Sequence, residues 1–315
     1  MEAVAIRSLP SIPVTLDADG LMRQFLSGKS ERTILAYRQD LEDFWAFVGA
    51  TSVNEAARSL LALSLGEANS VALAYRTHLL DRRLKPATVN RRLASLRSLV
   101  TLARTLGMVT WTLEVKNERR TPYKDTRGPG THAFREMLAL LAERGNRKAI
   151  RDRAILRLLF DLALRRGEVA ALDLQDLDLQ QATLLVLGKG HREKLSLTLA
   201  EPTRQALAGW VEVRGADPGP LFLNLDRAGK GSRLTGTSIF RMVRDLGRKV
   251  GVAVRPHGLR HTAITEACKA AQTNGMGIEE VLDFSRHADV KTLMVYRDRE
   301  RNVQGRLASM VAGTV

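Results

Sequence analysis

The side chains of this chain that could do chemistry are cations, imidazoles and a phenol, and they lie in the second half of its 315 residues. Guanidinium groups bind anions, and imidazoles exchange protons near neutral pH. The candidate catalytic residues are Arg165, Lys189, His257, Arg260, His287 and Tyr296. Singly, each has a structural explanation too: Arg165 can cap the last carbonyls of an apolar helix, and Lys189 lies between two glycines of a turn. His257 and Arg260 are three residues apart, so on a helix both can address one point.

The order and spacing of these residues resemble the active-site signature of the tyrosine recombinases, the phage integrase family. The chain has an arginine followed by a lysine 24 residues later, then a His-x-x-Arg motif, then a histidine and a tyrosine nine residues apart. Residues 160–169 (FDLALRRGEV) resemble the family's helix that carries its first arginine, and residues 188–190 (GKG) resemble its lysine hairpin. Residues 33–41 (TILAYRQDL) and 88–93 (TVNRRL) resemble its core-binding domain. The resemblance covers about residues 20–315.

The resemblance implies metal-free cleavage of a DNA phosphodiester with Tyr296 as the nucleophile. A phenol has a pKa of about 10 and leaves a phosphodiester readily, so a 3′-phosphotyrosyl bond retains the energy for religation. Arg165 and Arg260 would hold the non-bridging oxygens of the phosphate. Lys189 would protonate the leaving 5′-oxygen, because neighbouring arginines lower the pKa of a lysine.

Three further residues complete the expected site. His257 would take or share the tyrosine proton, His287 would hydrogen-bond the phosphate, and Glu168 would support Arg165. No cofactor or metal is implied, because the chain has neither a carboxylate cluster with the spacing of two-metal nucleases nor a Cys/His cluster with zinc spacing.

Two positions depart from the family's usual pattern. The family usually has glycine two residues before its first arginine, where this chain has Ala163, and glycine directly before its second histidine, where this chain has Arg286. We expect the Arg286 cation either to crowd the phosphate or to give it an extra contact, so that activity is weakened or tuned. Arg166 competes for the role of Arg165, although only Arg165 keeps the 24-residue spacing to the lysine.

Composition independently favours a nucleic-acid partner. The chain has 49 Lys and Arg against 34 Asp and Glu, a formal net charge of +15, which attracts polyanions. Its 26% of charged and 44% of hydrophobic residues are ordinary for a globular protein long enough for about two domains. The single cysteine, Cys268, cannot form an internal disulfide, and we find no apolar run typical of a membrane span or secretion signal. We therefore expect a cytoplasmic, nucleoid-associated protein.

The expected fold class is multidomain. Periodicity predicts a flexible N-terminus (1–16), a helical bundle over residues 17–112 and a basic linker over residues 113–130. The resemblance implies that the bundle is an all-α, SAM-like core-binding domain and that residues 131–315 form the catalytic domain. The catalytic domain would be mixed α+β, mainly helical, with a small antiparallel sheet. In the bundle, helical spacing predicts helices from Ser30 to Val48, over about 67–80 and after Pro86.

In the catalytic domain, two short apolar runs predict a hairpin with Lys189 at its tip. Its strands would be residues 183–187 and 195–199. A helix would precede the hairpin and run into Arg165. Later helices are expected over residues 201–213, 237–250, 258–272, 277–284 and 290–299.

Basic residues run from Arg82 to Arg104 with no acidic residue between them. Such a run is often a solvated helix face, but the absence of acids favours phosphate contact. With two residues of the linker, the candidate DNA-contacting residues are Arg82, Arg83, Lys85, Arg91, Arg92, Arg97, Lys124 and Arg127.

The resemblance further implies a homotetramer on synapsed double-stranded DNA sites, with a dimer per site. It would exchange strands through a Holliday junction in integration, excision or resolution, with accessory DNA-bending or directionality proteins. The segment 300–315 carries a short apolar stripe that either packs on its own domain or docks on a neighbouring protomer. Because we expect no folded domain before residue 20, an Xer-like or transposon-type enzyme fits better than an integrase that needs arm sites.

Two other functions remain open. One is an enzyme resembling type IB topoisomerases, which would relax supercoiled DNA without a specific site. The other, suggested by Arg286, is a DNA-binding regulator that keeps the fold but has lost cleavage.

Overall fold

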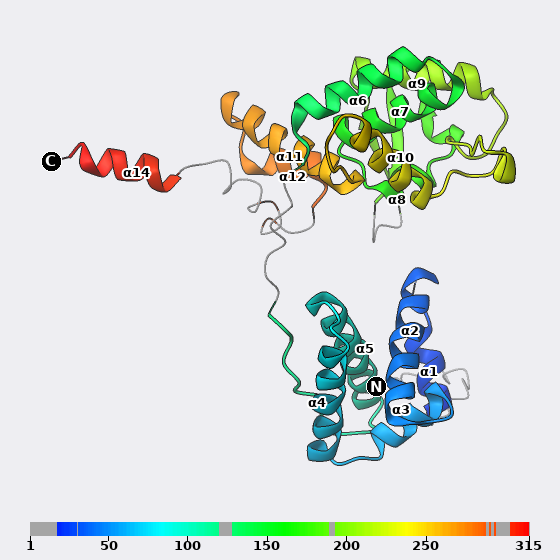
Figure 1. Ribbon diagram of the computed structural model, residues 1–315, viewed down its shortest axis with the longest axis vertical. Helices are drawn as coiled ribbons and strands as arrows, with labels where there is room; N and C mark the ends of the chain where they lie inside the picture. Colours follow the sequence, from blue (N-terminus) through cyan, green and yellow to red (C-terminus); the bar gives the residue numbers. More distant parts are fainter. Residues whose placement is uncertain are drawn as a thin grey trace, which may run out of the picture. The chain divides into compact units, whose positions relative to one another are not determined.

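The computed structural model describes residues 18–29, 31–119, 128–188, 193–287, 290, 293 and 303–314. The chain divides into two compact units, Met1–Tyr123 and Lys124–Val315, and each has its own hydrophobic core. Figure 1 shows that the first unit consists of helices, whereas the second combines helices with a small sheet. The expected fold class is therefore confirmed.

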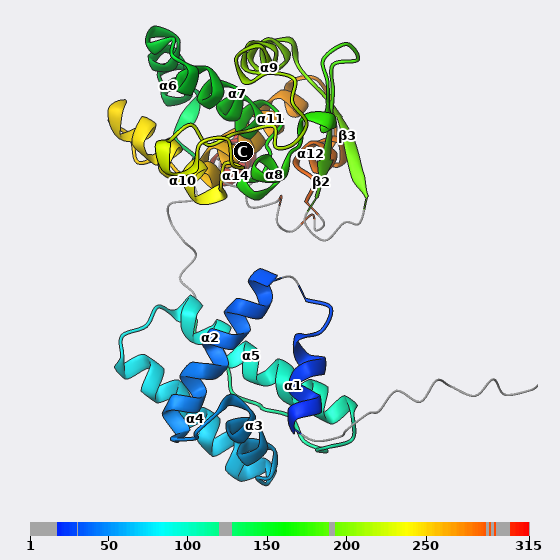
Figure 2. The ribbon, with the colours of Figure 1, turned by 90° about the vertical axis from the view of Figure 1, so that its right-hand side faces the viewer.

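Three helices of the first unit begin at recognisable sequence signals. Ser52 caps α3 by accepting from the Glu55 N–H (3.1 Å), and Ser64 and Glu67 form a capping box at α4. Pro86 occupies the first turn of α5, where no intrahelical donor is needed. The helices are α1 (Ala18–Leu26), α2 (Glu31–Val48), α3 (Val53–Leu61), α4 (Leu65–Asp81) and α5 (Pro86–Thr105), shown in Figure 2.

The core of the first unit forms where the apolar faces of these helices meet. Leu41 and Phe44 of α2 are buried, and the Phe44 ring packs edge-on against Tyr75, with ring centroids 5.1 Å apart. Val48, the last residue of α2, is exposed. The three helices predicted in this unit are confirmed as α2, α4 and α5.

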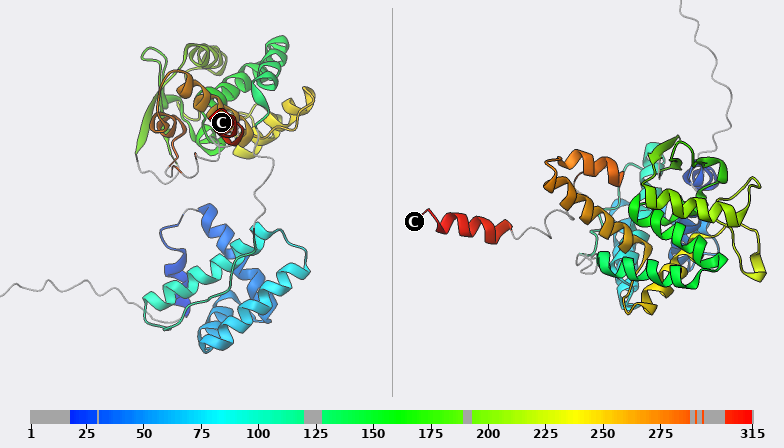
Figure 3. Two further views of the ribbon diagram at one scale, coloured as in Figure 1. Left: turned by 90° about the vertical axis from the view of Figure 1, so that its left-hand side faces the viewer. Right: turned by 90° about the horizontal axis from the view of Figure 1, so that it is seen from above.

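The second unit is organised around α7, whose apolar side chains are fully buried along most of its length. Helices α6, α9 and α11 pack against it (Figure 3). The elements are α6 (Gly130–Arg144), α7 (Arg147–Asp161), α8 (Arg166–Ala171), η1 (Leu174–Asp176), β1 (Leu177–Asp178), β2 (Thr183–Leu187), β3 (Lys194–Thr198), α9 (Glu201–Arg214), η2 (Arg227–Gly229), α10 (Gly236–Lys249), α11 (Pro256–Thr273), α12 (Ile278–Ser285) and α14 (Val303–Ala312).

The sheet has the order β1-β2-β3 and is antiparallel throughout. Strands β2 and β3 form the predicted hairpin, in register from Thr183 opposite Thr198 to Leu187 opposite Lys194, and lie at one edge of the unit (Figure 2). Lys189, expected at the tip, lies outside the described residues.

The later helices confirm the sequence predictions as α9, α10, α11 and α12, each within two residues of the expected bounds. Most of the helix expected over residues 290–299 falls outside the described residues. None of the helices in the described ranges is long and apolar enough to cross a membrane.

One predicted helix end is wrong. The helix expected to run into Arg165 is α7, and it ends at Asp161. Ala163 has a φ of +46°, in the left-handed region, which breaks the helix and redirects the chain. Arg165 is therefore the N-cap of the next helix, α8, with an extended backbone (φ −74°, ψ 147°).

Candidate active site

The turn between α7 and α8 places the first candidate arginine. Leu164 N donates to Leu158 O (3.1 Å), so the turn folds back on α7. Ala163 is fully buried in its left-handed conformation, at a cost of roughly 1–2 kcal/mol for a residue other than glycine. The surrounding packing maintains that strained geometry.

Glu168 anchors Arg165 from the first turn of α8. The carboxylate accepts from Arg165 Nη1 (2.7 Å, at Oε1) and from Arg165 N (2.8 Å, at Oε2). Its side chain is 4% exposed, whereas the Arg165 side chain is 32% exposed. Arg165 Nη2 also donates to Arg286 O (3.1 Å). These contacts agree with the supporting role expected of Glu168, and they place Arg165 beside the end of α12.

Helix α11 contributes the His-x-x-Arg pair. It begins at Pro256 after the extended Arg255, so His257 and Arg260 fall on its first turns. The buried Arg260 donates to Ala163 O through Nη1 and to Ser285 O through Nη2, and its Nη2 lies 3.3 Å from His287 Nε2. Arg260 thus joins the α7–α8 turn to the end of α12.

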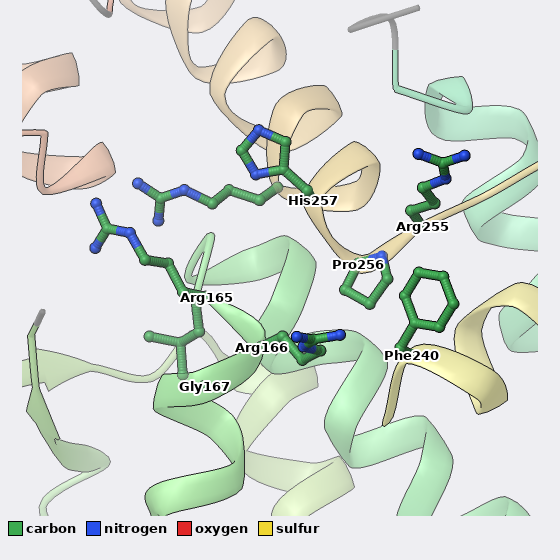
Figure 4. A pocket seen from close by; sticks show the side chains of 9 residues that line it. Arg165, Arg166, Gly167, Phe240, Arg255, Pro256 and His257 are labelled. Atoms are coloured by element: carbon green, nitrogen blue, oxygen red, sulfur yellow. The ribbon is translucent and has the colours of Figure 1, made fainter. Parts of the chain in front are cut away.

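Arg165, His257 and Arg260 line one cavity of about 390 Å³. Figure 4 shows Arg165 and His257 together, with Arg166 lying lower, beside Phe240. The Arg166 guanidinium lies 5.8 Å from the centre of the Phe240 ring, so its direction differs from that of Arg165. The full lining is Leu164, Arg165, Arg166, Gly167, Phe240, Arg255, Pro256, His257 and Arg260. A cavity lined by four arginines and no carboxylate is suited to an anion.

Both candidate histidines of this region favour the neutral form. Partial desolvation lowers the pKa of His257, and the charges of Arg260 and Arg165 lower it further. Desolvation and the same two arginines lower the pKa of His287 to about 4. A neutral imidazole can accept a proton or hydrogen-bond an oxygen near neutral pH.

Arg286 does not lie in either place expected for it. It ends α12 with a φ of +52°, and its side chain, 11% exposed, is absent from the cavity lining. The guanidinium donates to Leu162 O (3.1 Å), Ala163 O (3.2 Å) and Glu168 Oε2 (3.3 Å). It therefore neither crowds the cavity nor adds a contact there, because it is directed into the α7–α8 turn.

The chain enters this unit against the first turns of α11. Gly130 N donates to Thr262 Oγ1 (3.3 Å). A Cβ on Gly128 would lie 1.8 Å from Thr262 Oγ1 and 2.3 Å from Gly258 O, far inside contact distance. The close approach therefore requires glycine at position 128.

Several predicted DNA-contacting arginines of the first unit are held by carboxylates of α2. Arg82 pairs with Asp43 (2.8 Å), Arg91 with Asp40 (2.6 Å), and Arg92 with Asp43 (2.6 Å). Burial raises the pKa of Asp40 to about 6, against the opposing charges of Arg91 and Arg92. Burial acts to raise the pKa of Asp43, but hydrogen bonds from Arg82 and Tyr75 and the charges of Arg92 and Arg82 together lower it.

The other members of that set differ among themselves. Arg97 donates to Val115 O (2.7 Å) and Asn117 Oδ1 (2.7 Å), whereas Arg83 and Lys85 are exposed between α4 and α5. Four predicted site residues lie outside the described residues: Lys189, Tyr296, Lys124 and Arg127. The structure thus brings together Arg165, His257, Arg260 and His287.

Two residues that line the cavity were not predicted from the sequence. Phe240 and Arg255 line it, but neither belongs to a recognisable motif, so no sequence signal could have identified them. Within the ranges that the structure covers, no group of three or more His, Cys, Asp or Glu side chains could hold a metal ion.

Comparison with known proteins gives consistent matches. Residues 132–302 match the phage integrase family. A tyrosine recombinase of Synechococcus elongatus is 38% identical over 99% of this chain and 98% of its own length, and one of Synechocystis is 36% identical over 93% of both chains. Among solved structures, a lambda integrase dimer bound to a core site has a similar fold, with a TM-score of 0.66 at 14% identity, covering 90% of this chain and 95% of that one.

We predict that His287 in the DNA-free protein titrates at about pH 4, below the ordinary value for histidine. Between the ordinary pKa and this lowered one, the unfolded chain binds more protons than the folded chain, so stability should fall as the pH decreases through that interval. Imidazole NMR shifts, assigned with His287→Gln, measure the pKa. The same variant should flatten the decline of Tm in acid, and a His287 pKa at or above its ordinary value would contradict the prediction.

Proposed function

Because the chain belongs to the phage integrase family and is a tyrosine recombinase that acts in site-specific DNA recombination, we propose that it cleaves and rejoins DNA through a 3′-phosphotyrosyl intermediate at Tyr296. The observation that carries this proposal is the convergence of Arg165, His257 and Arg260 on one cavity. These groups suit a single phosphodiester, since two guanidinium groups can replace the charge that a metal ion would otherwise supply.

In the proposed cleavage step, the Tyr296 hydroxyl attacks phosphorus while His257 accepts its proton. The lowered pKa of His257 supports this assignment, because the imidazole must be neutral to act as a base. As the bond to the 5′-oxygen breaks, Lys189 donates a proton to that oxygen. The reverse sequence, with a new 5′-hydroxyl as nucleophile, rejoins the strand without ATP.

Charge that develops on the non-bridging oxygens would be stabilised by Arg165 and Arg260. The contacts of Arg165 with Glu168 and Arg286 O use one N–H of each Nη, and a guanidinium has five N–H groups, so donors remain for the phosphate. His287, next to Arg260, would hydrogen-bond the same phosphate.

We further propose that the first unit is the core-binding domain and the second the catalytic domain, joined by the basic linker. The protein would act as a tetramer on two synapsed double-stranded sites and pass through a Holliday junction. Arg83 and Lys85, exposed between α4 and α5, are the favoured phosphate contacts of the first unit.

The nucleophile is tested with a nicked suicide substrate drawn from fragments of the native locus. Wild type should form a denaturation-resistant protein–DNA adduct, and Tyr296→Phe should form none because it lacks the hydroxyl. Tyr37→Phe, which removes a hydroxyl from the first unit, is the matched control and should form the adduct.

Each other result selects a different interpretation. An adduct with Tyr296→Phe would mean that another residue is the nucleophile. DNA binding without an adduct from wild type would favour the inactive regulator. Relaxation of supercoiled plasmid without a specific site would favour the topoisomerase-like enzyme.

Exposed basic residues of the first unit should contribute to DNA binding, whereas those paired with carboxylates should contribute to stability. Arg83→Gln and Lys85→Gln should each reduce the slope of log Kobs against log salt by about 0.9, the value for one lost phosphate contact. Arg92→Gln should instead lower the unfolding free energy by about 1–3 kcal/mol, because it deprives Asp40 and Asp43 of a partner. Fluorescence anisotropy at several salt concentrations and urea unfolding measure the two effects.

Arg204→Gln, which removes an exposed arginine paired with Glu201 on α9, is the control for lost charge. It should change neither the salt slope nor the stability appreciably. Equal slopes for all the variants would refute the proposed division of the basic residues.

The C-terminal helix α14 is proposed to dock on a neighbouring protomer. Its Met310 and Val311 are 63% and 66% exposed, which leaves apolar surface for a partner. Deleting residues 301–315 should therefore preserve DNA binding and abolish strand exchange. Met310→Glu should reduce strand exchange more than Met276→Glu, which changes another exposed methionine. Normal recombination by the truncated protein would refute the docking.

A further inference from the structure

Among the turns of the second unit that contain a left-handed residue other than glycine, two are joined by one side chain. Ala163 lies between α7 and α8, and Arg286 ends α12. The Arg286 guanidinium donates to Leu162 O (3.1 Å) and Ala163 O (3.2 Å). Since a left-handed backbone is strained for both residues, these hydrogen bonds help to hold the two turns against each other.

The same guanidinium holds the carboxylate that supports Arg165. Arg286 Nη2 lies 3.3 Å from Glu168 Oε2, while Arg165 Nη1 donates to Glu168 Oε1 (2.7 Å). A buried carboxylate needs partners for both oxygens, and two cations on different oxygens determine its orientation. Arg286 therefore fixes the group from which Arg165 takes its position.

Arg286 also shares contacts with two of the cavity arginines, Arg165 and Arg260. Ala163 O accepts from Arg286 and from Arg260, and Arg286 O accepts from Arg165 Nη2 (3.1 Å). Its own guanidinium is not part of the cavity lining. The contact pattern is that of a residue that holds other arginines in place without meeting the substrate.

We propose that Arg286 is a positioning residue that sets the guanidinium groups of Arg165 and Arg260 through Glu168 and Ala163 O. This inference rests on the proposed function, in which those two arginines bind the scissile phosphate. Loss of Arg286 should leave the DNA-binding surface intact and loosen the phosphate-binding geometry, to which the cleavage step is sensitive.

The test measures single-turnover adduct formation at saturating suicide substrate, together with the Kd for DNA. Arg286→Gly accommodates the left-handed backbone and removes only the side chain. We expect its cleavage rate to fall on the order of 10- to 100-fold with an unchanged Kd. Arg286→Lys should recover part of the rate, because an ammonium can reach Glu168 but cannot reproduce the guanidinium's fork of contacts.

A double-mutant cycle tests the route through Glu168. In a Glu168→Gln background, Arg286→Gly should reduce the rate by a smaller factor than in wild type, since the shared contact is already weakened. Equal factors in both backgrounds would overturn the route. Arg204→Ala, which breaks an exposed pair with the same i, i+3 spacing as Arg165 and Glu168, is the control and should cleave like wild type.

Other outcomes separate this inference from the proposed function. Wild-type cleavage by Arg286→Gly would overturn the inference. So would a rate loss that follows the loss of Tm and DNA affinity and disappears at a lower temperature, because it would indicate a merely structural role. Absence of any adduct from wild type would instead refute the proposed function.

Discussion

One buried carboxylate orders the candidate active site. Glu168 is removed from water, and such an anion is tolerated only where cations and N–H groups replace its hydration. Arg165 and Arg286 provide that replacement, so the carboxylate draws α8 and the end of α12 together. Arg165, which faces the cavity, thus takes its position from a group that does not itself line it.

Much of the fold was predictable because its longer helices have a regular apolar period. Periodicity located α2, α5, α9, α10 and α11, and strict alternation located the hairpin of β2 and β3. It missed α1 and α3, whose nine residues are too few to show a period, although Ser52 and Glu55 are a cap signal for α3. No helix was expected at α6 or α8 either. The end of α7 was misplaced because an alanine gives no warning of a left-handed turn.

The candidate site residues were easier to predict from the sequence than the residues that contact them. Spacing selected Arg165, His257, Arg260 and His287, which the structure brings together. Pairing across the chain was not predictable, because it depends on tertiary packing. Between residues 82 and 104 the sequence contains no acidic residue, yet Asp40 and Asp43 of α2 pair with three arginines of this segment. Likewise, the Arg286 side chain contacts a turn that lies more than a hundred residues earlier in the sequence.

The close fit of Gly128 against α11 has a mechanical consequence. Without room for a Cβ, the chain just before α6 is clamped between the Gly258 carbonyl and Thr262, on the same turns that carry His257 and Arg260. A displacement of the backbone at Gly128 would also displace these turns of α11. Gly128 and the cavity-lining residues His257 and Arg260 are therefore coupled through the first turns of α11.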